Sequence, residues 1–224
     1  MVDADVAIFA RLPVLGKVKT RLACGVGPER ALRFYKACAE HVFRECSKCK
    51  TTRATVYFSV DDDLPGAKAW LAAADLTLPC APQVKDEDLG VRMHAALEAL
   101  LAQQCTSKAI VIGTDIPDIS ASILEQAVSA LNSHEIVIGP AVDGGYYLLG
   151  VTVAAKELFQ GIAWSTDSVF QQTMHKAKEL QLQAYTLPTL QDIDTMQDLE
   201  QWRSASLLQN ANHPIMPVVT DILQ

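Results

Sequence analysis

The sequence predicts an α/β fold built on a mostly parallel sheet that is covered by helices on both faces. Short apolar segments alternate with amphipathic segments from end to end of the 224 residues. The apolar segments are continuous rather than alternating, which is typical of strands buried on both faces. The chain contains no Gly/Ser/Pro-rich linker and no repeat. We therefore expect a single domain over residues 1–208, followed by a tail over residues 209–224.

The first third of the chain predicts two strands and two helices. An apolar run over residues 5–10 predicts the first strand, and a long loop over residues 11–27 follows it. Pro28 in the first turn and apolar residues at three- and four-residue spacing predict a helix over residues 28–47. We then expect a strand and a short helix, over residues 54–60 and 67–74.

The rest of the chain continues the alternation. Apolar residues on one face indicate a helix over residues 90–103, and an apolar run over 108–113 predicts a strand. Ser120 is a suitable N-cap for a further helix. The remaining predicted elements are a helix over 120–131, strands over 135–139 and 146–151, a helix over 166–180, a strand over 183–187 and a last helix that begins at Thr195.

Charge and hydropathy exclude several classes of protein. Lys and Arg number 19 against 26 Asp and Glu, so the formal net charge is −7. Binders of nucleic acid and of anionic membrane surfaces need a basic face, which this composition does not indicate. No apolar run approaches the roughly 18 residues of a transmembrane helix, and the N-terminal residues do not resemble a signal peptide. We expect a cytoplasmic protein that binds no nucleic acid.

The six cysteines are irregularly spaced in a chain long enough to bury a core without disulfides. We expect reduced, partly buried thiols. Two alternatives stay open. One is a zinc site formed by Cys38, His41, Cys46 and Cys49, and the other is a redox disulfide.

A basic loop follows the first predicted strand. Arg11, Lys17, Lys19 and Arg21 lie in a stretch without any acid between Asp5 and Glu29. Ligands of α/β sheets bind at the carboxyl ends of the strands, and Gly16 lets the backbone approach a ligand closely. The loop therefore predicts an anionic phosphate ligand, with a solvated charged loop as the alternative.

Carboxylates follow three later strands. Asp115 comes directly after the strand over 108–113, where a hard cation would find an oxygen ligand. Asp143 precedes two glycines between two apolar runs, a pattern that also predicts a hairpin turn. Asp192 and Asp194 follow the strand over 183–187. Bases, carboxylates and a divalent cation together suit a nucleoside diphosphate or triphosphate.

Six blocks of the sequence, in order, resemble a bacterial family first catalogued as a domain of unknown function (DUF2064) and grouped with GT-A-type glycosyltransferases. The blocks begin at Phe9, Asp88, Gly113, Gly139, Trp164 and Asp192. The resemblance implies a Rossmann-like GT-A fold, a nucleotide crevice and a bound Mg²⁺ or Mn²⁺. It implies Asp115 and Asp194 as metal ligands and Lys17, Lys19 and Arg21 as phosphate-binding residues. To these we add Asp143 as the expected catalytic residue, and as further nucleotide- or substrate-binding residues Arg11, Gly144, Gly145, Tyr146, Trp164 and Ser165.

The resulting functional hypothesis is a metal-dependent glycosyltransferase with a nucleotide-diphospho-sugar donor and a small-molecule or lipid acceptor. A nucleotidyltransferase acting on a nucleoside triphosphate and a phosphorylated acceptor is the alternative, because both reactions use the same residue types on the same fold. A nucleotide-binding protein without catalytic activity is a third reading. The sequence contains no pattern that predicts a nucleophilic triad.

Overall fold

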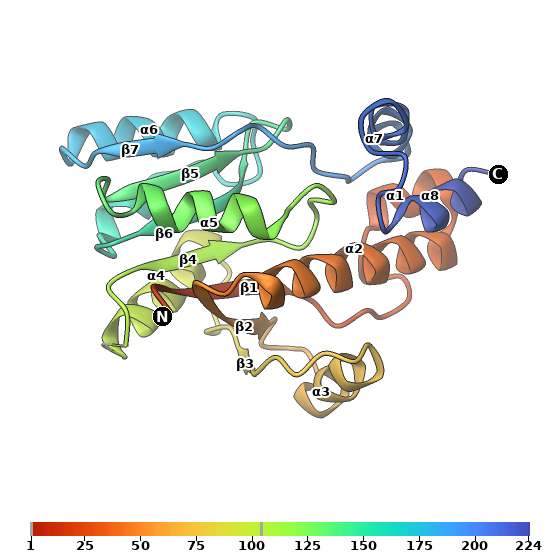
Figure 1. Ribbon diagram of the computed structural model, residues 1–224, viewed down its shortest axis with the longest axis horizontal. Helices are drawn as coiled ribbons and strands as arrows, with labels where there is room; N and C mark the ends of the chain where they lie inside the picture. The colour runs from red at the N-terminus through yellow and green to blue at the C-terminus, as the bar shows by residue number, and fades with distance from the viewer. Residues whose placement is uncertain (1, 104) are drawn as a thin grey trace.

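The fold is an α/β domain around one central sheet (Figure 1). The computed structural model describes residues 2–103 and 105–224, and in these residues the sheet has seven strands in the order β3-β2-β1-β4-β6-β5-β7. The strands are β1 (Ala4–Ala10), β2 (Thr52–Phe58), β3 (Cys80–Pro82), β4 (Ala109–Ile112), β5 (Ile136–Pro140), β6 (Tyr146–Val151) and β7 (Ala184–Thr186). Only β6, among these strands, runs against its neighbours. The predicted mostly parallel, mixed sheet is confirmed.

Helices cover both faces of the sheet, as predicted. They are α1 (Thr20–Val26), α2 (Pro28–Lys48), α3 (Leu64–Ala73), α4 (Leu89–Ala102), α5 (Ala121–Ala130), α6 (Val169–Glu179), α7 (Met196–Gln209) and α8 (Met216–Ile222), with a 3₁₀ turn over Lys156–Phe159. On one face α2, α3 and α5 pack against the sheet residues Ile8 and Ile110. On the other face α4, the 3₁₀ turn and α6 pack against Ala7 and Val111. Adjacent residues of one strand thus face opposite layers.

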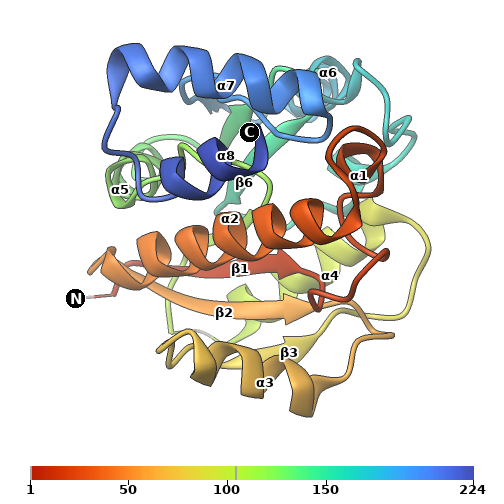
Figure 2. The same cartoon turned by 90° about the vertical axis from the view of Figure 1, so that its right-hand side faces the viewer.

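A third apolar cluster lies beyond the sheet, where α7 and α8 pack on α1 and α2 (Figure 2). It joins Leu22 and Phe34 to Trp202 and Val219, all of them fully or almost fully buried. The Trp202 indole nitrogen also donates to Asp118 Oδ2 at 2.9 Å. Residues 216–222, which lie in the segment predicted as a tail, therefore form a helix in this cluster.

The predicted elements agree with the observed ones to within three residues at each end, but α1, β3, the 3₁₀ turn and α8 were not predicted. Residues 11–27 are not all loop, because α1 occupies Thr20–Val26. This helix has seven residues and buries only Leu22, so it carries no amphipathic repeat that a sequence pattern could reveal. Lys19 at its start has a left-handed φ of 50°, and its end is Gly27 with φ 88°.

All six cysteines are free thiols, and Cys38, Cys46 and Cys49 are buried in the core. Burial raises the pKa of the Cys38 and Cys46 thiols well above their usual range, which keeps them protonated. In the part of the chain that the structure describes, no helix has the length and apolarity needed to cross a bilayer.

Two buried histidines make stability depend on pH. The rings of His41 and His213 lie 4.9 Å apart, and each Nε2 faces a backbone carbonyl, of Ile119 and Pro117 respectively. Burial lowers the pKa of both, and the charge of His213 lowers that of His41 further. The hydrogen bonds to the two carbonyls, and Asp118 at His213, only partly oppose these shifts. At these two side chains the unfolded chain therefore binds more protons than the folded one just below pH 6.5.

We expect the contribution of these histidines to the free energy of unfolding to fall as the pH drops from 7.5 through 6.5 to 5.5, because both imidazoles must be kept neutral in the fold. Urea titrations at these three pH values measure it. The variant His213→Gln, which keeps a nitrogen donor, should show a shallower loss over the same range. An equal slope in both proteins would contradict this assignment.

Candidate functional site

Loops at one edge of the sheet bring the predicted site residues together. β1, β4, β5 and β7 run in the same direction, so the loops that follow them lie at a common edge. These loops carry Lys19, Asp115, Asp143 and Asp194. A backbone hydrogen bond of 3.1 Å from Ile193 N to Asp115 O ties the last of these loops to the β4 loop.

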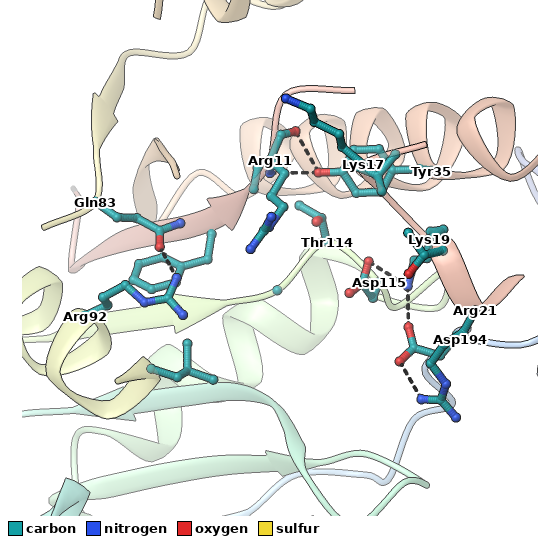
Figure 3. Close-up of a pocket in the computed structure, with 16 residues that line it drawn as sticks. Arg11, Lys17, Lys19, Arg21, Tyr35, Gln83, Arg92, Thr114, Asp115 and Asp194 are labelled. Atoms are coloured by element: carbon teal, nitrogen blue, oxygen red, sulfur yellow. Dashed lines mark hydrogen bonds and ion pairs between the residues drawn. The ribbon is translucent and has the colours of Figure 1, made fainter. Parts of the chain in front are cut away.

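Lys19 is the centre of this arrangement (Figure 3). Its Nζ lies 2.9 Å from Asp115 Oδ1 and 2.8 Å from Asp194 Oδ1, and its side chain is only 4% exposed. Arg21 Nη1 lies 3.3 Å from the other Asp194 oxygen. Two of the four bases of the predicted phosphate loop are thus paired with the two predicted metal ligands.

The pairing sets the charge state of both partners. Burial alone would lower the pKa of Lys19, but Asp115 and Asp194 outweigh it and hold the pKa above its ordinary value. Burial would likewise raise the pKa of Asp194, but Lys19 and Arg21 outweigh it and lower that pKa. The ammonium and the carboxylate are both charged near neutral pH.

Helix starts hold both partners in place. Lys19 lies directly before α1, in the left-handed backbone conformation that turns the loop into the helix. Asp194 lies directly before the N-cap of α7, where Thr195 and Asp198 form a capping box. Asp198 Oδ2 also accepts from the backbone N–H of Asp194 at 3.1 Å. The capping box therefore fixes the backbone that presents the Asp194 carboxylate.

A cationic half of the cleft lies on the β1 side of this group (Figure 3). It is a cavity of about 450 Å³ whose lining includes Arg11, Lys17 and Arg92. The backbone of Arg11 is held by Tyr35, whose hydroxyl accepts from Arg11 N and donates to Arg11 O, both at 2.8 Å. No ion pair among the described residues engages Arg11, Lys17 or Arg92.

Arg92 and Gln83 belong to this half, although the sequence did not single them out as ligands. Gln83 is 7% exposed; its Nε2 donates to Tyr57 O at 2.9 Å, and its Oε1 accepts from Arg92 Nη1 at 2.8 Å. Arg92 does lie in one of the blocks that resemble the family, which was the available signal. For Gln83 the sequence offered none.

An acidic and aromatic half lies on the β5–β6 side. This cavity of about 390 Å³ is lined by all of the predicted substrate residues of that region except Gly144, and by Asp192 in addition. Those predicted residues are Asp143, Gly145, Tyr146, Trp164 and Ser165. The two cavities share Leu89, Gly113, Asp115 and Asp194. The cleft is therefore continuous, and its halves meet at the Asp115–Asp194 pair.

Asp192 is a functional candidate that sequence reasoning placed in the right loop without assigning it a role. Its Oδ1 accepts from the backbone N–H of Asp143 at 3.3 Å. Burial raises the pKa of Asp192 to about 6, and the charges of Asp143 and Asp194 add to the effect. Asp143 itself is exposed, and its Oδ1 caps the turn by accepting from Gly145 N at 2.8 Å.

A segment over residues 163–168 packs on the glycine turn. Phe170 N donates to Gly144 O at 2.9 Å, and a Cβ on Gly144 would lie 2.0 Å from the carbonyl oxygen of Asp167. The Trp164 ring meets Tyr146 edge to face at 6.5 Å. Its indole nitrogen is buried and has no hydrogen-bond partner among the described residues. Gly144 thus lets the 163–168 segment pack closely on the turn. This segment contributes Trp164 to the wall of the cavity.

The Asp115–Asp194 pair fits a divalent cation in donor type and in the convergence of its oxygens. One oxygen of each residue already contacts a single cation, the Lys19 ammonium, at 2.8–2.9 Å. Magnesium is commonly held by one or two carboxylates together with phosphate oxygens and water. Within residues 2–103 and 105–224, no cluster of three or more metal-binding side chains occurs.

Comparisons with known proteins agree with this architecture. Residues 42–166 match the model of a family described as an uncharacterized protein conserved in bacteria (DUF2064). None of the curated proteins matches the chain. A crystal structure from Desulfovibrio desulfuricans G20, described provisionally as a nucleotide-diphospho-sugar transferase, is 27% identical with a TM-score of 0.89 and covers 99% of this chain and 95% of its own.

Two more distant structures share the fold. The 4-diphosphocytidyl-2C-methyl-D-erythritol synthase of Anaerococcus prevotii is 13% identical, with a TM-score of 0.59 over 93% of this chain and 97% of its own. Rv0371c of Mycobacterium tuberculosis, in complex with manganese, is 12% identical, with a TM-score of 0.50 over 89% and 97%. The chain has the fold of nucleotide-diphospho-sugar transferases, as the sequence predicts.

Proposed function

This chain belongs to the bacterial family DUF2064, and from that premise we propose that it is a metal-dependent glycosyltransferase with a nucleotide-diphospho-sugar donor. The proposal rests on the division of the cleft into two chemically different halves. A cationic half and an acidic, aromatic half meet at Asp115 and Asp194. A nucleotide-sugar is divided in the same way, with a charged diphosphate on one side and a ring of neutral hydroxyls on the other.

In this proposal the cationic half binds the nucleoside diphosphate. Arg11 and Lys17 extend from the β1 loop, while Lys19 and Arg21 lie beside the acids. Asp115 and Asp194 would hold Mg²⁺ or Mn²⁺, which when bound neutralises the negative charge that develops on the leaving diphosphate. Lys19 would then share the carboxylates with that ion or turn toward the phosphates.

The other half would bind the sugar and the acceptor, a small molecule or a lipid. Asp143 is exposed to the cleft and, as the proposed catalytic residue, accepts hydrogen bonds from sugar hydroxyls. Gly144 and Gly145 let the backbone approach a ring closely. Tyr146, Trp164 and Ser165 form the wall against which the ring packs. The unpartnered indole nitrogen of Trp164 supplies a further donor.

The test is a calorimetric comparison of several nucleotide-sugars with their matching nucleoside diphosphates in the presence of Mn²⁺. We expect the preferred nucleotide-sugar to bind about tenfold more tightly than its diphosphate, the scale of one hydrogen bond to a charged group. Asp143→Asn should erase this difference and leave diphosphate binding unchanged, because the amide keeps the turn but loses the charge.

A second candidate function follows from the fold shared with the Anaerococcus prevotii synthase. In this reading the protein is a nucleotidyltransferase, which transfers the nucleotidyl group of a nucleoside triphosphate to a phosphorylated acceptor and releases pyrophosphate. The same residues would then surround the α-phosphate. Release of pyrophosphate in such a reaction, together with tighter binding of the triphosphate than of any nucleotide-sugar, would replace the glycosyltransferase proposal with this one.

A further inference from the structure

The bases that line the cationic half of the cleft fall into two groups that differ in their partners. The first group is Lys19 and Arg21, whose charges are balanced by Asp115 and Asp194 at 2.8–3.3 Å. The net charge of these four side chains is zero. An incoming anion would have to displace a carboxylate to reach Lys19, and at Arg21 the charge of Asp194 already offsets that of the guanidinium, so the electrostatic gain is reduced at both bases.

The second group is Arg11, Lys17 and Arg92, which line the same cavity and carry three positive charges. The ion pairs of the described residues leave all three without a carboxylate within 4.0 Å. Figure 3 shows the Arg11 and Arg92 side chains reaching toward the same space from different elements, the end of β1 and α4. Like charges placed together in this way are stabilised by an anion between them.

The Arg92 side chain is held in place by Gln83. Its Nη1 donates to Gln83 Oε1 at 2.8 Å, and Gln83 is itself fixed by a hydrogen bond to the carbonyl of Tyr57 in β2. The Arg92 Nε is buried and has no hydrogen-bond partner among the described residues. A buried donor of this kind costs free energy unless a ligand satisfies it.

The charges around Arg92 leave it available to a ligand. Burial lowers the pKa of Arg92, and the charge of Arg11 lowers it further, while Asp86 and Asp88 oppose the shift. These two acids are occupied with backbone groups: Asp86 Oδ1 accepts from Asp88 N at 2.8 Å, and Asp88 Oδ1 accepts from Val91 N at 3.0 Å. Asp86 and Asp88 therefore reduce the positive potential around Arg92, but neither forms an ion pair with its guanidinium.

We propose that Arg92, with Arg11 and Lys17, forms the diphosphate-binding subsite of the cleft, and that Lys19 and Arg21 chiefly organise Asp115 and Asp194. The inference rests on the proposed function, because it names the residues that hold the donor's diphosphate. It assigns a binding role to Arg92, and to Gln83 the role of a positioning residue. It also places the diphosphate between two groups that line the cavity: the arginines Arg11 and Arg92, and the Asp115–Asp194 pair.

The test uses inorganic pyrophosphate, titrated calorimetrically into the protein with a metal chelator present, so that it reports on the bases alone. Arg92→Gln and Arg11→Gln should each weaken pyrophosphate binding by about tenfold or more, the effect of losing a charge-assisted hydrogen bond. Arg21→Gln, the same chemical change in a base that is 71% exposed and paired, should weaken it by less than about threefold. Arg33→Gln, outside the cleft, is the background control.

A second variant approaches the same subsite without altering an arginine. Gln83→Glu places a carboxylate beside Arg92, so it should weaken pyrophosphate binding about as much as Arg92→Gln. Melting temperatures show which variants remain folded. Orthophosphate should bind at least about tenfold more weakly than pyrophosphate, because it can reach only part of the subsite.

Three results would overturn the inference: undetectable pyrophosphate binding by the unmodified protein, equal binding of orthophosphate and pyrophosphate, or a larger loss in Arg21→Gln than in Arg92→Gln. Failure of the proposed function looks different. In that case pyrophosphate still binds through Arg11 and Arg92, but no nucleotide-sugar binds more tightly than its matching nucleoside diphosphate.

Discussion

Replacing Asp115 with asparagine is expected to abolish the stabilisation that Mn²⁺ gives in the presence of pyrophosphate. An ion that binds only the folded protein, at 100 times its dissociation constant, adds about 2.7 kcal/mol to the free energy of unfolding. Asparagine removes one of the two carboxylates that we propose as ligands of the ion, while Asp194 can still pair with Lys19. Thermal melts with and without Mn²⁺ measure the effect.

The matched control is Asp118→Asn, because Asp118 lies in the same loop but lines neither half of the cleft. Its Oδ2 accepts from the Trp202 indole, and asparagine can keep that hydrogen bond. This variant should retain the full Mn²⁺-dependent shift, whatever its own stability. A full shift in Asp115→Asn would mean that Asp115 is not a metal ligand.

Gly144→Ala should lower the free energy of unfolding by about 2–4 kcal/mol. Gly144 has a φ of 88°, which an L side chain adopts only with strain, and its Cβ would lie 2.0 Å from the backbone oxygen of Asp167. Backbone cannot move aside as a flexible side chain could, so the 163–168 segment must shift. Urea unfolding measures the loss of stability.

Gly161→Ala separates the two causes. Gly161 has a similar φ of 71°, but a Cβ there meets nothing within 4 Å. The variant should cost about 1 kcal/mol, the backbone contribution alone. If the two variants lose the same stability, the contact with Asp167 is not what restricts position 144.

Local patterns were sufficient to predict six of the seven strands, whereas β3, a three-residue strand that ends in proline, was missed. The strands are short apolar runs, and the rule that ligands bind at the carboxyl edge then collects Asp115, Asp143 and Asp194 without any knowledge of contacts. The helix α1 was missed because its seven residues bury only Leu22. A helix this short leaves no periodic signal against the surrounding loop.

The partners of Lys19 were beyond the reach of the sequence. Asp194 is 175 positions away, and the buried ion pair depends on the left-handed backbone of Lys19 and on the start of α7. The role of Arg92 was hidden for another reason. The amphipathic repeat of α4 identifies Met93 and Leu97 as buried, but it does not distinguish an arginine facing the cleft from one facing bulk water.

The cluster that joins α1 and α2 to α7 and α8 can form during synthesis only after the C-terminal helices have been translated. Ribosomes add roughly 5–20 residues per second, so the 175 residues between Lys19 and Asp194 represent roughly 10–35 s of translation. During that interval Phe34 and Leu22 lack Trp202 and Val219, and the Lys19 ammonium has at most one of its two carboxylates. The ion-pair group of Lys19, Asp115 and Asp194 is thus among the last features that the growing polypeptide completes.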